Sequence, residues 1–547
     1  MRRAVDRARF GVEAGDLARR QFRWAEAASA YRGYLERRPR DAAITVRLAA
    51  VLDASGSRRE AMAVLQAALA VQPRSPALLR AYGALVQVAP PESDWSQARL
   101  SPRPAPPFAV VGEARFEILR ATADVLLHDD AEAWLAYALD STGAVAAYAD
   151  HELRPEKPRE SWSAVLQGAP HPLDMATMSA PPVVAAFRPG FAPLTNMPLR
   201  DALLAALSKG PVAHVPLVLA EVSDGQSHFA APTFTVDPDV KPLRILVVVP
   251  TRDRGDVLEV MVDSLVSKAA RPDALSIVVV DNGSRDPETL RRLQEWSAEG
   301  RIRNLRIDEP FNWSDLNNRA VIGHEADAFL FINNDVEMLT EGWDLRVFSH
   351  LSRPDAGVVG ARLIYPAGNL QHAGMALGAQ PHTTASPGPL HEGLGAQGDD
   401  EGPESRWRRV RPAAAVTGAF LAVSRTVFED AGGFDATTFP VGANDVDFCL
   451  RVRSLGRMIV YDGGIELRHH ESLSRGHDDD PEGQGRAEQE RQALRRIWGG
   501  DAVFDPSRNP AWVPDGVLLF AGYRVPDPAA VLAWIERSVD AWRARRA

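Results

Sequence analysis

The middle of the chain holds three short clusters of polar side chains, and each cluster follows directly on an apolar run. The clusters contain carboxylates, amides, hydroxyls and guanidinium groups, all of which hydrogen-bond polar ligands. They are Pro250–Asp253, Asp281–Ser284 and Asn333–Glu337. Their chemistry is that of a polar ligand site, provided that the fold brings the three clusters together.

The apolar runs that precede the clusters predict buried strands. Residues 245–249, 277–280 and 329–332 consist of Ile, Leu, Val and Phe, and such runs are typical of strands buried on both faces. The helical stretches between them predict parallel strands with crossover helices. Ligands of such sheets bind beyond the carboxyl ends of the strands, so we expect the three clusters to line one site.

Further motifs follow the clusters in a fixed order. They are Phe311–Asn318, Gly360–Pro366, Gln371–Gly374, Val416–Ala419, Gly432–Asp435, Asn444–Arg451 and His469–Ser472. Together with the three clusters, this series resembles a rhamnosyltransferase-like family 2 glycosyltransferase with the GT-A fold. The resemblance covers residues from about 243 to about 500. It implies an inverting, metal-dependent transfer of sugar from a nucleotide-sugar donor to a hydroxyl of a glycan or other acceptor, in bacterial surface polysaccharide or glycan assembly.

The resemblance also implies which residues hold the donor nucleotide. These are Pro250, Thr251, Arg252, Asp253, Asp281, Asn333 and Asn334. Asp253 and Asp281 stand at the tips of the first two strands, where a carboxylate can accept hydrogen bonds from a nucleobase or a ribose hydroxyl. The alternative for both is a structural role as a cap of the next helix.

The implied metal site centres on Asp335. Asn333–Asp335 occupies the place of the family's Asp-x-Asp motif, and Mg²⁺ or Mn²⁺ takes few protein carboxylates and keeps several waters. Asn333 removes one negative charge, so we expect the donor diphosphate to complete the site. His469 resembles the family's late metal-binding histidine and favours Mn²⁺. Adjacent side chains on extended backbone point to opposite faces, so only one of His469 and His470 is expected to reach the ion, and His469 is preferred.

The implied catalytic base is Asp445. It matches the position where inverting members of the family carry the base for the acceptor hydroxyl, although Asn444 replaces the usual Glu before it. If Asp445 opens a helix, Asp447 lies in the first turn, where the helix dipole favours a structural carboxylate. Cys449 follows on the same helix and is expected in the core.

The composition bounds the class of protein. The chain has 547 residues with a net charge of −10, which gives no general attraction to nucleic acid or to an anionic membrane. The apolar runs are of strand length, so no transmembrane segment is expected. A single cysteine and an N-terminus without a signal-peptide pattern predict a location in the cytoplasm or peripherally at the inner face of the membrane.

The first ninety residues contain an internal repeat. Pairs of similar residues recur 34 positions apart, the tetratricopeptide period; the pairs are Ala27 and Ala61, Tyr31 and Leu65, Leu35 and Leu69, and Pro39 and Pro73. Small alanines let paired helices approach closely, and the prolines end the second helix of each pair. The helices either form a groove for a protein partner or serve as a spacer that packs on the enzyme.

The remaining segments complete the predicted organisation. Residues 1–90 form the all-α tetratricopeptide-like segment, 91–107 a Pro-rich linker, 108–237 a degenerate α/β GT-A-like segment, 238–500 the catalytic α/β domain with a doubly wound, mostly parallel sheet, and 501–547 a C-terminal tail. The segment 108–237 lacks the first two strand-end clusters, so we expect it to be structural. In the tail, Asp527 and Pro528 predict the start of a final helix.

Two other functions compete with sugar transfer. A sugar nucleotidyltransferase needs a Gly-rich phosphate loop after the first strand, and Pro250–Gly255 does not supply one. A scaffold made of tetratricopeptide repeats and an inactive glycosyltransferase domain stays open because Asn333 replaces an expected carboxylate.

Overall fold

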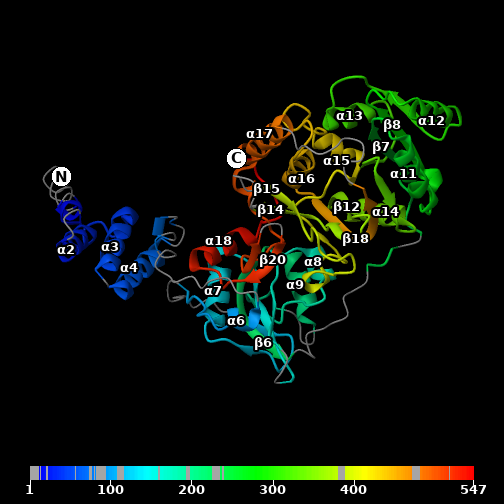
Figure 1. Ribbon diagram of the computed structural model, residues 1–547. Coiled ribbons are helices and arrows are strands. Elements are labelled where there is room, and N and C mark those ends of the chain that lie inside the picture. The colour runs from blue at the N-terminus through cyan, green and yellow to red at the C-terminus, as the bar shows by residue number, and fades with distance from the viewer. Residues whose placement is uncertain are drawn as a thin grey trace. The chain divides into compact units, whose positions relative to one another are not determined.

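The computed structural model (Figure 1) describes residues 12–546 apart from 13, 20–22, 56, 73, 74, 76, 79, 80, 82–93, 107–115, 158–160, 193–196, 224–233, 237, 238, 380–387, 471–480, 516 and 517. The chain forms two compact units. Unit 1 takes Met1–Leu166, Pro182–Ser227 and Gly522–Val539, and unit 2 takes Gln167–Pro181, His228–Ala521 and Asp540–Ala547. Each unit is therefore assembled from segments that are distant in sequence, and its limits differ from the domain limits predicted above.

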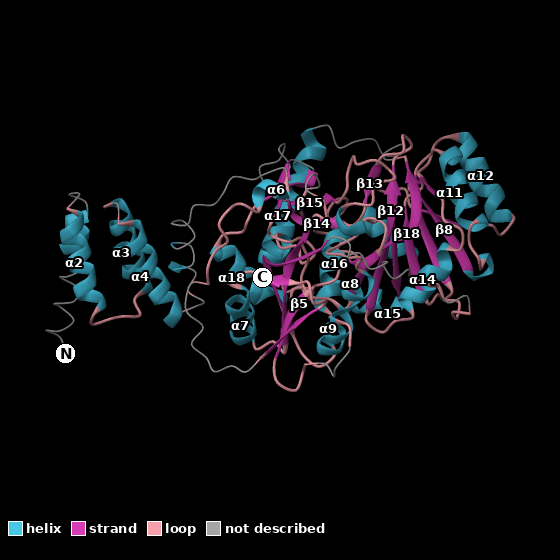
Figure 2. Ribbon diagram, turned by 90° about the horizontal axis from the view of Figure 1, so that it is seen from below, coloured by secondary structure: helices cyan, strands magenta, loops and turns pink. Residues whose placement is uncertain are grey.

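The N-terminal part of unit 1 is helical, as the repeat predicts. Its helices are α2 (Trp24–Leu35), α3 (Ala42–Ala54) and α4 (Arg58–Val71), which lie side by side in Figure 2. Ala27, Tyr31, Ala61 and Leu65 are all fully buried, so the residues that repeat at 34 positions form the packed face. Asp41 caps α3 by accepting a hydrogen bond from the Ile44 N–H, which gives a partner to one of the otherwise unpaired N–H groups at that helix start.

The rest of unit 1 contains a mixed sheet in the order β1-β5-β3-β6-β2, with β4 beside β3. Its strands are β1 (Glu117–Arg120), β2 (Leu126–Leu127), β3 (Ala146–Arg154), β4 (Ser163–Val165), β5 (Val184–Phe187) and β6 (Val212–Ser223). Its helices are α6 (Trp95–Ala98), α7 (Ala131–Thr142), α9 (Leu199–Leu207) and α18 (Pro528–Ser538). Helix α6 falls inside the stretch predicted as linker, and α18 starts after the Asp527 cap, as predicted.

Unit 2 is built on a larger mixed sheet in the order β11-β18-β12-β17-β10-β7-β8-β9, with β13 beside β12 and β16 beside β18. Its strands are β7 (Ile245–Thr251), β8 (Leu275–Asp281), β9 (Arg303–Arg306), β10 (Ala328–Ile332), β11 (Val336–Met338), β12 (Ala356–Ile364), β13 (Leu370–His372), β16 (Val410–Pro412), β17 (Phe420–Ser424) and β18 (Met458–His469). Strands β10, β7, β8 and β9 run parallel, which confirms the three predicted strands and their direction.

Helices cover both faces of the unit 2 sheet. Residues alternate along β7, so Leu246 and Val248 enter one core and Val247 and Val249 the other. Helices α11 (Gly255–Ser267), α12 (Pro287–Ala298) and α14 (Trp343–Leu351) pack on the second of these cores. Helices α13 (Trp313–Ala320), α15 (Arg425–Asp430), α16 (Asn444–Ser454) and α17 (Pro481–Trp498) pack on the first. This is a doubly wound α/β arrangement.

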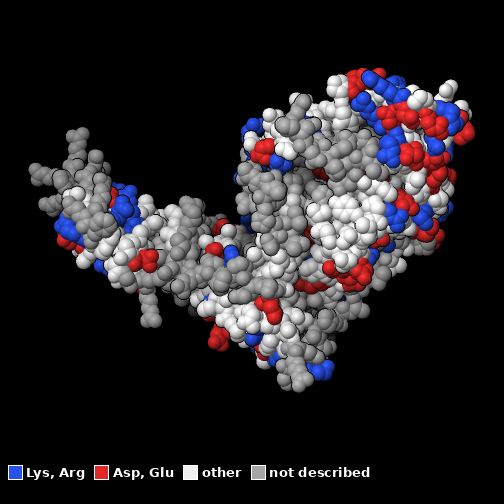
Figure 3. All heavy atoms as spheres, in the orientation of Figure 1, with Lys and Arg blue, Asp and Glu red and all other residues white. Residues whose placement is uncertain are grey.

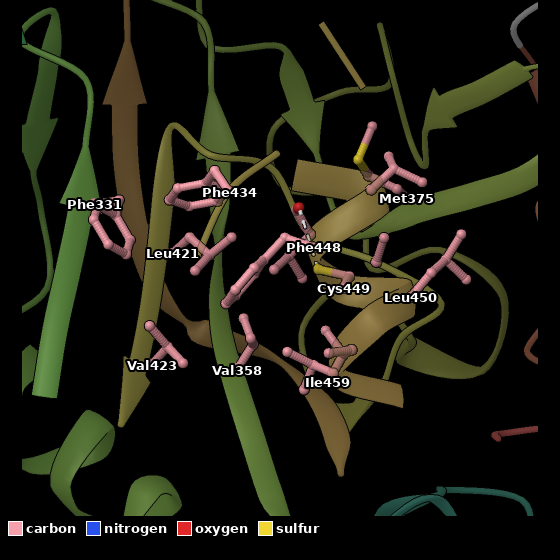
Figure 4. Close-up of a cluster of buried hydrophobic side chains, with 14 of the residues drawn as sticks. Phe331, Val358, Met375, Leu421, Val423, Phe434, Phe448, Cys449, Leu450 and Ile459 are labelled. Atoms are coloured by element: carbon pink, nitrogen blue, oxygen red, sulfur yellow. Dashed lines mark hydrogen bonds between the residues drawn. The ribbon is translucent and has the colours of Figure 1, made fainter. Parts of the chain in front are cut away.

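The core beneath α16 is aromatic. Figure 4 shows Phe331, Phe434 and Phe448 gathered between the strands and this helix. Cys449 is fully buried beside them, as predicted, and burial raises the pKa of its thiol to about 12. The thiol is therefore protonated at neutral pH, and the side chain is part of the hydrophobic core.

The remaining helices and strands are short. They are α8 (Pro172–Thr177), β14 (Met375–Ala379), β15 (Gly388–His391), β19 (Trp512–Asp515), β20 (Leu518–Tyr523) and the 3₁₀ turns Pro272–Ala274, Pro403–Ser405 and Gly499–Ala502. Figure 3 shows acidic and basic side chains interspersed over α11 and α12, where Arg291 bridges to both Glu288 and Glu295. In the described part of the chain, no helix is both long and apolar enough to cross a bilayer.

The unit 1 sheet repeats the topology of half of the unit 2 sheet. The order β1-β5-β3-β6-β2 corresponds to β10-β17-β12-β18-β11. In both series the pairs run antiparallel, antiparallel, parallel and antiparallel. The irregularity at Ala149 in the β3–β6 pair matches that at Ala361 in the β12–β18 pair. Unit 1 therefore holds a copy of the second half of the unit 2 fold, as the sequence predicts for a degenerate GT-A-like segment.

Candidate active site

A cavity of about 690 Å³ opens in unit 2 at the carboxyl ends of β7 and β10. Most of the residues predicted for the site line it: Pro250, Thr251, Arg252, Asp253, Asn333, Asn334, Asp335, Asp445 and His469. The other lining residues are Arg254, Asn282, Phe311, Trp313, Gln371, His391, Thr417, Gly418, Ala419, Val441 and Asn444. The fold thus brings together polar residues that are up to 219 positions apart (469 − 250), as parallel strands ending at one edge require.

Asp281 is the exception among the predicted residues. Its side chain is fully buried, and its carboxylate accepts hydrogen bonds from the Arg306 guanidinium at 2.7 Å and from the Ser284 N–H at 2.8 Å. It is not part of the cavity wall, where Asn282 takes its place. The structure therefore places Asp281 where it shapes the turn after β8, and a direct contact with a nucleotide stays a prediction.

The loop after β7 is held in an unusual backbone conformation. Asp253 and Arg254 both have a φ of 55°, a left-handed conformation that is uncommon for residues other than glycine. The Asp253 carboxylate accepts hydrogen bonds from the N–H groups of Arg285 and Asp286, each at 2.7 Å. Asp253 thus ties the loop after β7 to the loop after β8. It does not cap the next helix, since α11 begins without a side-chain cap.

A second tie joins the ends of β7 and β10. The Asn334 amide donates to the Thr251 hydroxyl at 2.8 Å, and both side chains are buried. Thr251 and Asn334 therefore fix the floor of the cavity, while Arg252 is exposed at its rim.

Asp335 and His469 form the centre of the predicted metal site. His469 is paired with Val336 across the β11–β18 ladder, so its side chain lies beside that of Asp335, with 3.2 Å between His469 Nε2 and Asp335 Oδ1. Both side chains are almost fully buried. His470 instead follows the end of β18, and its N–H donates to the Asp335 carbonyl at 2.9 Å.

The residues present fit a divalent cation in part. The Gln371 Oε1 atom lies 2.8 Å from His469 Nδ1; if it accepts the Nδ1 proton, the Nε2 lone pair faces the Asp335 carboxylate. An imidazole nitrogen and a carboxylate oxygen are both ligands of Mn²⁺. Among the residues that the structure describes, no group of three or more His, Cys, Asp or Glu side chains is arranged to hold a metal ion, so water and phosphate oxygens would have to complete the coordination.

Asp445 faces the cavity from the N-terminus of α16. Its two carboxylate oxygens accept hydrogen bonds from the N–H groups of Gly418 and Val446, both at 2.9 Å. Desolvation raises the pKa of the Asp445 carboxyl above its ordinary value, although these N–H groups act in the opposite direction. Its solvent exposure is intermediate, as expected for a group at a cavity wall.

Asp447, two residues further on, points the other way. Its carboxylate accepts from Arg451 Nε at 2.8 Å and from Trp498 Nε1 at 2.9 Å, and it is 2% exposed. The first turn of α16 thus separates a cavity carboxylate from a core carboxylate.

Sequence reasoning gave no role to several residues that shape this site. Gln371 belongs to the Gln371–Gly374 motif, but only the folded structure shows that it contacts His469. Glu490 of α17 accepts hydrogen bonds from the N–H groups of Val441 and Gly442, each at 3.0 Å, and so fixes the loop that leads to Asp445. No local pattern identifies such contacts, because their partners lie about 50 to 100 positions away.

Comparisons with known proteins match two segments of the chain to families. Residues 246–385 match the model of glycosyl transferase family 2, and residues 18–85 match a tetratricopeptide repeat model. The chain is 35% identical over 271 residues to the uncharacterized protein y4gI of Sinorhizobium fredii, which covers 49% of this chain and 29% of that protein. It is 34% identical over 244 residues to the O-antigen biosynthesis protein RfbC of Myxococcus xanthus, with 44% and 18% covered. The chain thus spans less than a third of the length of either relative.

A third relative is shorter. The N-acetylglucosaminyl-diphospho-decaprenol L-rhamnosyltransferase of Mycobacterium tuberculosis is 26% identical over 253 residues, with 42% of this chain and 78% of that protein covered. Among solved structures, the mannosyltransferase PcManGT from Pyrobaculum calidifontis in complex with GDP-Man and Mn²⁺ gives a TM-score of 0.36 at 17% identity, covering 57% of this chain and 77% of that one. By its matching segments, the chain carries a glycosyltransferase domain of family 2, preceded by a tetratricopeptide repeat segment.

Proposed function

We propose that the protein is an inverting, metal-dependent glycosyltransferase that moves a sugar from a nucleotide-sugar donor to a hydroxyl of a glycan or other acceptor. The observation that carries the proposal is the single cavity that joins the strand-end clusters, the Asp335–His469 pair and Asp445. The names of two relatives, for O-antigen biosynthesis and for rhamnosyl transfer, support a role in bacterial surface polysaccharide assembly.

The donor nucleotide would lie over the ends of β7 and β8. Pro250, Thr251, Arg252 and Asp253 line this side of the cavity, with Asn333 and Asn334 beside them. The hydrogen bonds that Asp253 and Asn334 already make hold this surface in shape before the donor arrives, which lowers the entropy cost of binding. Asp281 would support the donor site indirectly, because it holds the turn after β8 that places Asn282 in the cavity wall.

A divalent cation, Mn²⁺ or Mg²⁺, would be held by Asp335 and His469. Its chemistry is to neutralise the charge that develops on the leaving diphosphate. Asp335 supplies the negative charge and Asn333, whose amide lies 3.4 Å from His469 Nε2, is a neutral neighbour. The site then depends on the donor for its remaining oxygens.

Asp445 would take the proton from the acceptor hydroxyl. A base works best when its pKa is close to the working pH, and desolvation moves the pKa of Asp445 in that direction. The N–H groups of Gly418 and Val446 fix the position of the carboxylate, so its free lone pairs can be aimed at the cavity.

The test uses the full chain and a panel of nucleotide sugars, with Mn²⁺ or with EDTA. A donor that binds only the folded state raises the melting temperature, and release of nucleoside diphosphate reports hydrolysis or transfer. We expect one donor to stabilise the protein and to turn over only with metal. Turnover that persists in EDTA would contradict the metal-dependent mechanism.

One observation favours a second function, that of a scaffold. Asn333 leaves the proposed metal site with one carboxylate, that of Asp335. The helices α2 to α4 would then offer a surface for a protein partner. If no nucleotide sugar shifts the melting temperature and none is hydrolysed, the scaffold becomes the better account. The same helices would bind a partner in either case.

A further inference from the structure

We propose that Gln371 positions His469 for the metal site, through a β-bulge that distinguishes the unit 2 sheet from its copy in unit 1. This inference rests on the proposed function, because it concerns the side chain that would ligate the cation. It adds a positioning residue that would act on the cation through His469.

The contact itself is close and shielded from water. Gln371 is 3% exposed and His469 is 7% exposed, and the distance between Gln371 Oε1 and His469 Nδ1 is 2.8 Å. With the glutamine oxygen as acceptor, the imidazole carries its proton on Nδ1 and turns Nε2 toward Asp335 Oδ1, 3.2 Å away. Histidines that bind metals commonly donate their other N–H to such an acceptor, which fixes both the tautomer and the ring orientation.

A bulge in β13 presents the glutamine. In the β12–β13 pair, Leu363 is opposite His372 and Ile364 is opposite Leu370, with a shift of register between them. Gln371 is the extra residue. Because strand residues alternate between faces, an inserted residue redirects a side chain that a regular ladder would place elsewhere, and bulges of this kind occur next to active sites.

The unit 1 copy lacks this arrangement. There β4 pairs with β3 without a shift, with Val165 opposite His151 and Ala164 opposite Glu152. By the strand correspondence, His372 falls at the place of Val165, and no residue of β4 corresponds to Gln371.

The copy also lacks the histidine. In the β11–β18 pair, Met338 is opposite Leu467, and in the β2–β6 pair, Leu127 is opposite Ala220. Counting two residues on from Leu467 and from Ala220 places Val222 where unit 2 has His469.

The carboxylate is nevertheless kept. Asp124 precedes β2 as Asp335 precedes β11. The Asp124 carboxylate accepts from the Ser223 N–H at 3.2 Å. In unit 2 the backbone carbonyl of Asp335, not its carboxylate, accepts from the N–H of the corresponding His470 at 2.9 Å. The glutamine and the histidine are thus absent together from a half-sheet that retains the aspartate, as expected if the two work as one unit.

The experiment measures Mn²⁺ binding by the electron paramagnetic resonance signal of the free ion, with the full chain and with Mn²⁺ alone or with UDP, GDP or dTDP. Gln371→Leu removes the acceptor and should weaken Mn²⁺ binding about 10- to 100-fold, the usual effect of removing such a partner. Gln371→Glu keeps an acceptor oxygen and should bind as tightly as the wild type or more tightly. If Gln371→Leu does not fold, Gln371→Asn, whose shorter side chain cannot reach Nδ1, replaces it.

Gln167→Leu is the matched control. Gln167 is also 3% exposed and donates to the Ala180 carbonyl at 3.0 Å, so its loss tests the general cost of removing a buried amide. Gln167→Leu should leave Mn²⁺ affinity unchanged.

Asp335→Ala separates the proposed metal site from the proposed positioning role of Gln371. If Asp335→Ala abolishes Mn²⁺ binding while Gln371→Leu or Gln371→Asn binds Mn²⁺ like the wild type, the positioning role is wrong and the metal site stands. If wild type and Asp335→Ala bind Mn²⁺ equally, or neither binds it with any nucleotide, the metal site itself is wrong, and the positioning role with it.

Discussion

Replacement of Asp445 by asparagine tests the proposed base directly. The amide has nearly the same shape but cannot take a proton, so binding of the donor should persist while turnover falls. Positioned acid–base catalysis contributes about 10²- to 10⁴-fold to rate. We therefore expect turnover of Asp445→Asn to drop by that factor, which is about 2.7 to 5.4 kcal/mol of barrier.

The expected effect on folding is small and follows from the environment of Asp445. Desolvation raises the pKa of the folded carboxyl, so the folded state holds its proton to higher pH than the unfolded chain does. The ionised form at neutral pH therefore destabilises the fold through this group, and removing the charge does not reduce stability. The remaining cost is one backbone hydrogen bond, from Gly418 or from Val446, about 0.5–1.5 kcal/mol.

The assay compares kcat, the KM for donor and the pH profile of the two proteins. Only the ionised carboxylate can act as base, so wild-type turnover should fall as pH decreases through the raised pKa of Asp445. This acid limb should lie above the range of an ordinary aspartate, about 3.9, and should be absent from Asp445→Asn. If the variant instead shows a raised KM with kcat unchanged, Asp445 is a binding residue and the reasoning is refuted.

Asp447→Asn is the matched control on the same helix. It leaves the buried Arg451 guanidinium without its charged partner, and breaking a buried pair typically costs about 3–5 kcal/mol. We expect a lower melting temperature and a nearly unchanged kcat for the folded fraction, the reverse of the result for Asp445→Asn. A large loss of kcat in Asp447→Asn with an unchanged melting temperature would exchange the two roles.

The other predictions concern the metal, the copy and the cavity wall. Asp335→Ala should lose Mn²⁺-dependent nucleotide binding, measured by thermal shift, while circular dichroism shows the fold intact; retained binding would remove Asp335 from the metal site. Simultaneous replacement of Asp129 and Asp130 by alanine should leave transfer nearly intact, because the copy in unit 1 lacks the first two strand-end clusters. A loss as large as that of Asp335→Ala would give unit 1 a catalytic role. Gly418→Ala would place a methyl group 3.0 Å from the Trp313 ring, so this ring of the cavity wall has to shift. KM for donor or acceptor should then rise several-fold in the folded protein, and an unchanged KM would show that this wall does not contact substrate.

The sequence by itself determined the parallel strands of unit 2. Short runs of Ile, Val, Leu and Phe are typical of strands in a parallel sheet that is covered on both faces, and β7, β8 and β10 lie where these runs predict. The 34-residue spacing likewise predicted the buried positions Ala27 and Ala61, since each repeat is one helix pair with the same packed face. The helix start marked by Asp527 followed from capping alone.

Tertiary structure decided what the polar residues of these elements do. Asp253 and Asp281 look equivalent in sequence, yet Asp253 lines the cavity while Asp281 is buried against Arg306. Asp445 and Asp447 are two positions apart, and only the packing of Trp498 and Arg451 on one side of α16 separates their roles.

The same holds for the bulge at Gln371 and for the assembly of each unit from distant segments. Capping and burial patterns act over a few residues, so they are legible in the chain. Strand register and the meeting of residues about a hundred positions apart, such as Gln371 and His469, depend on how all the strands pack at once, and that is fixed only when the whole sheet forms.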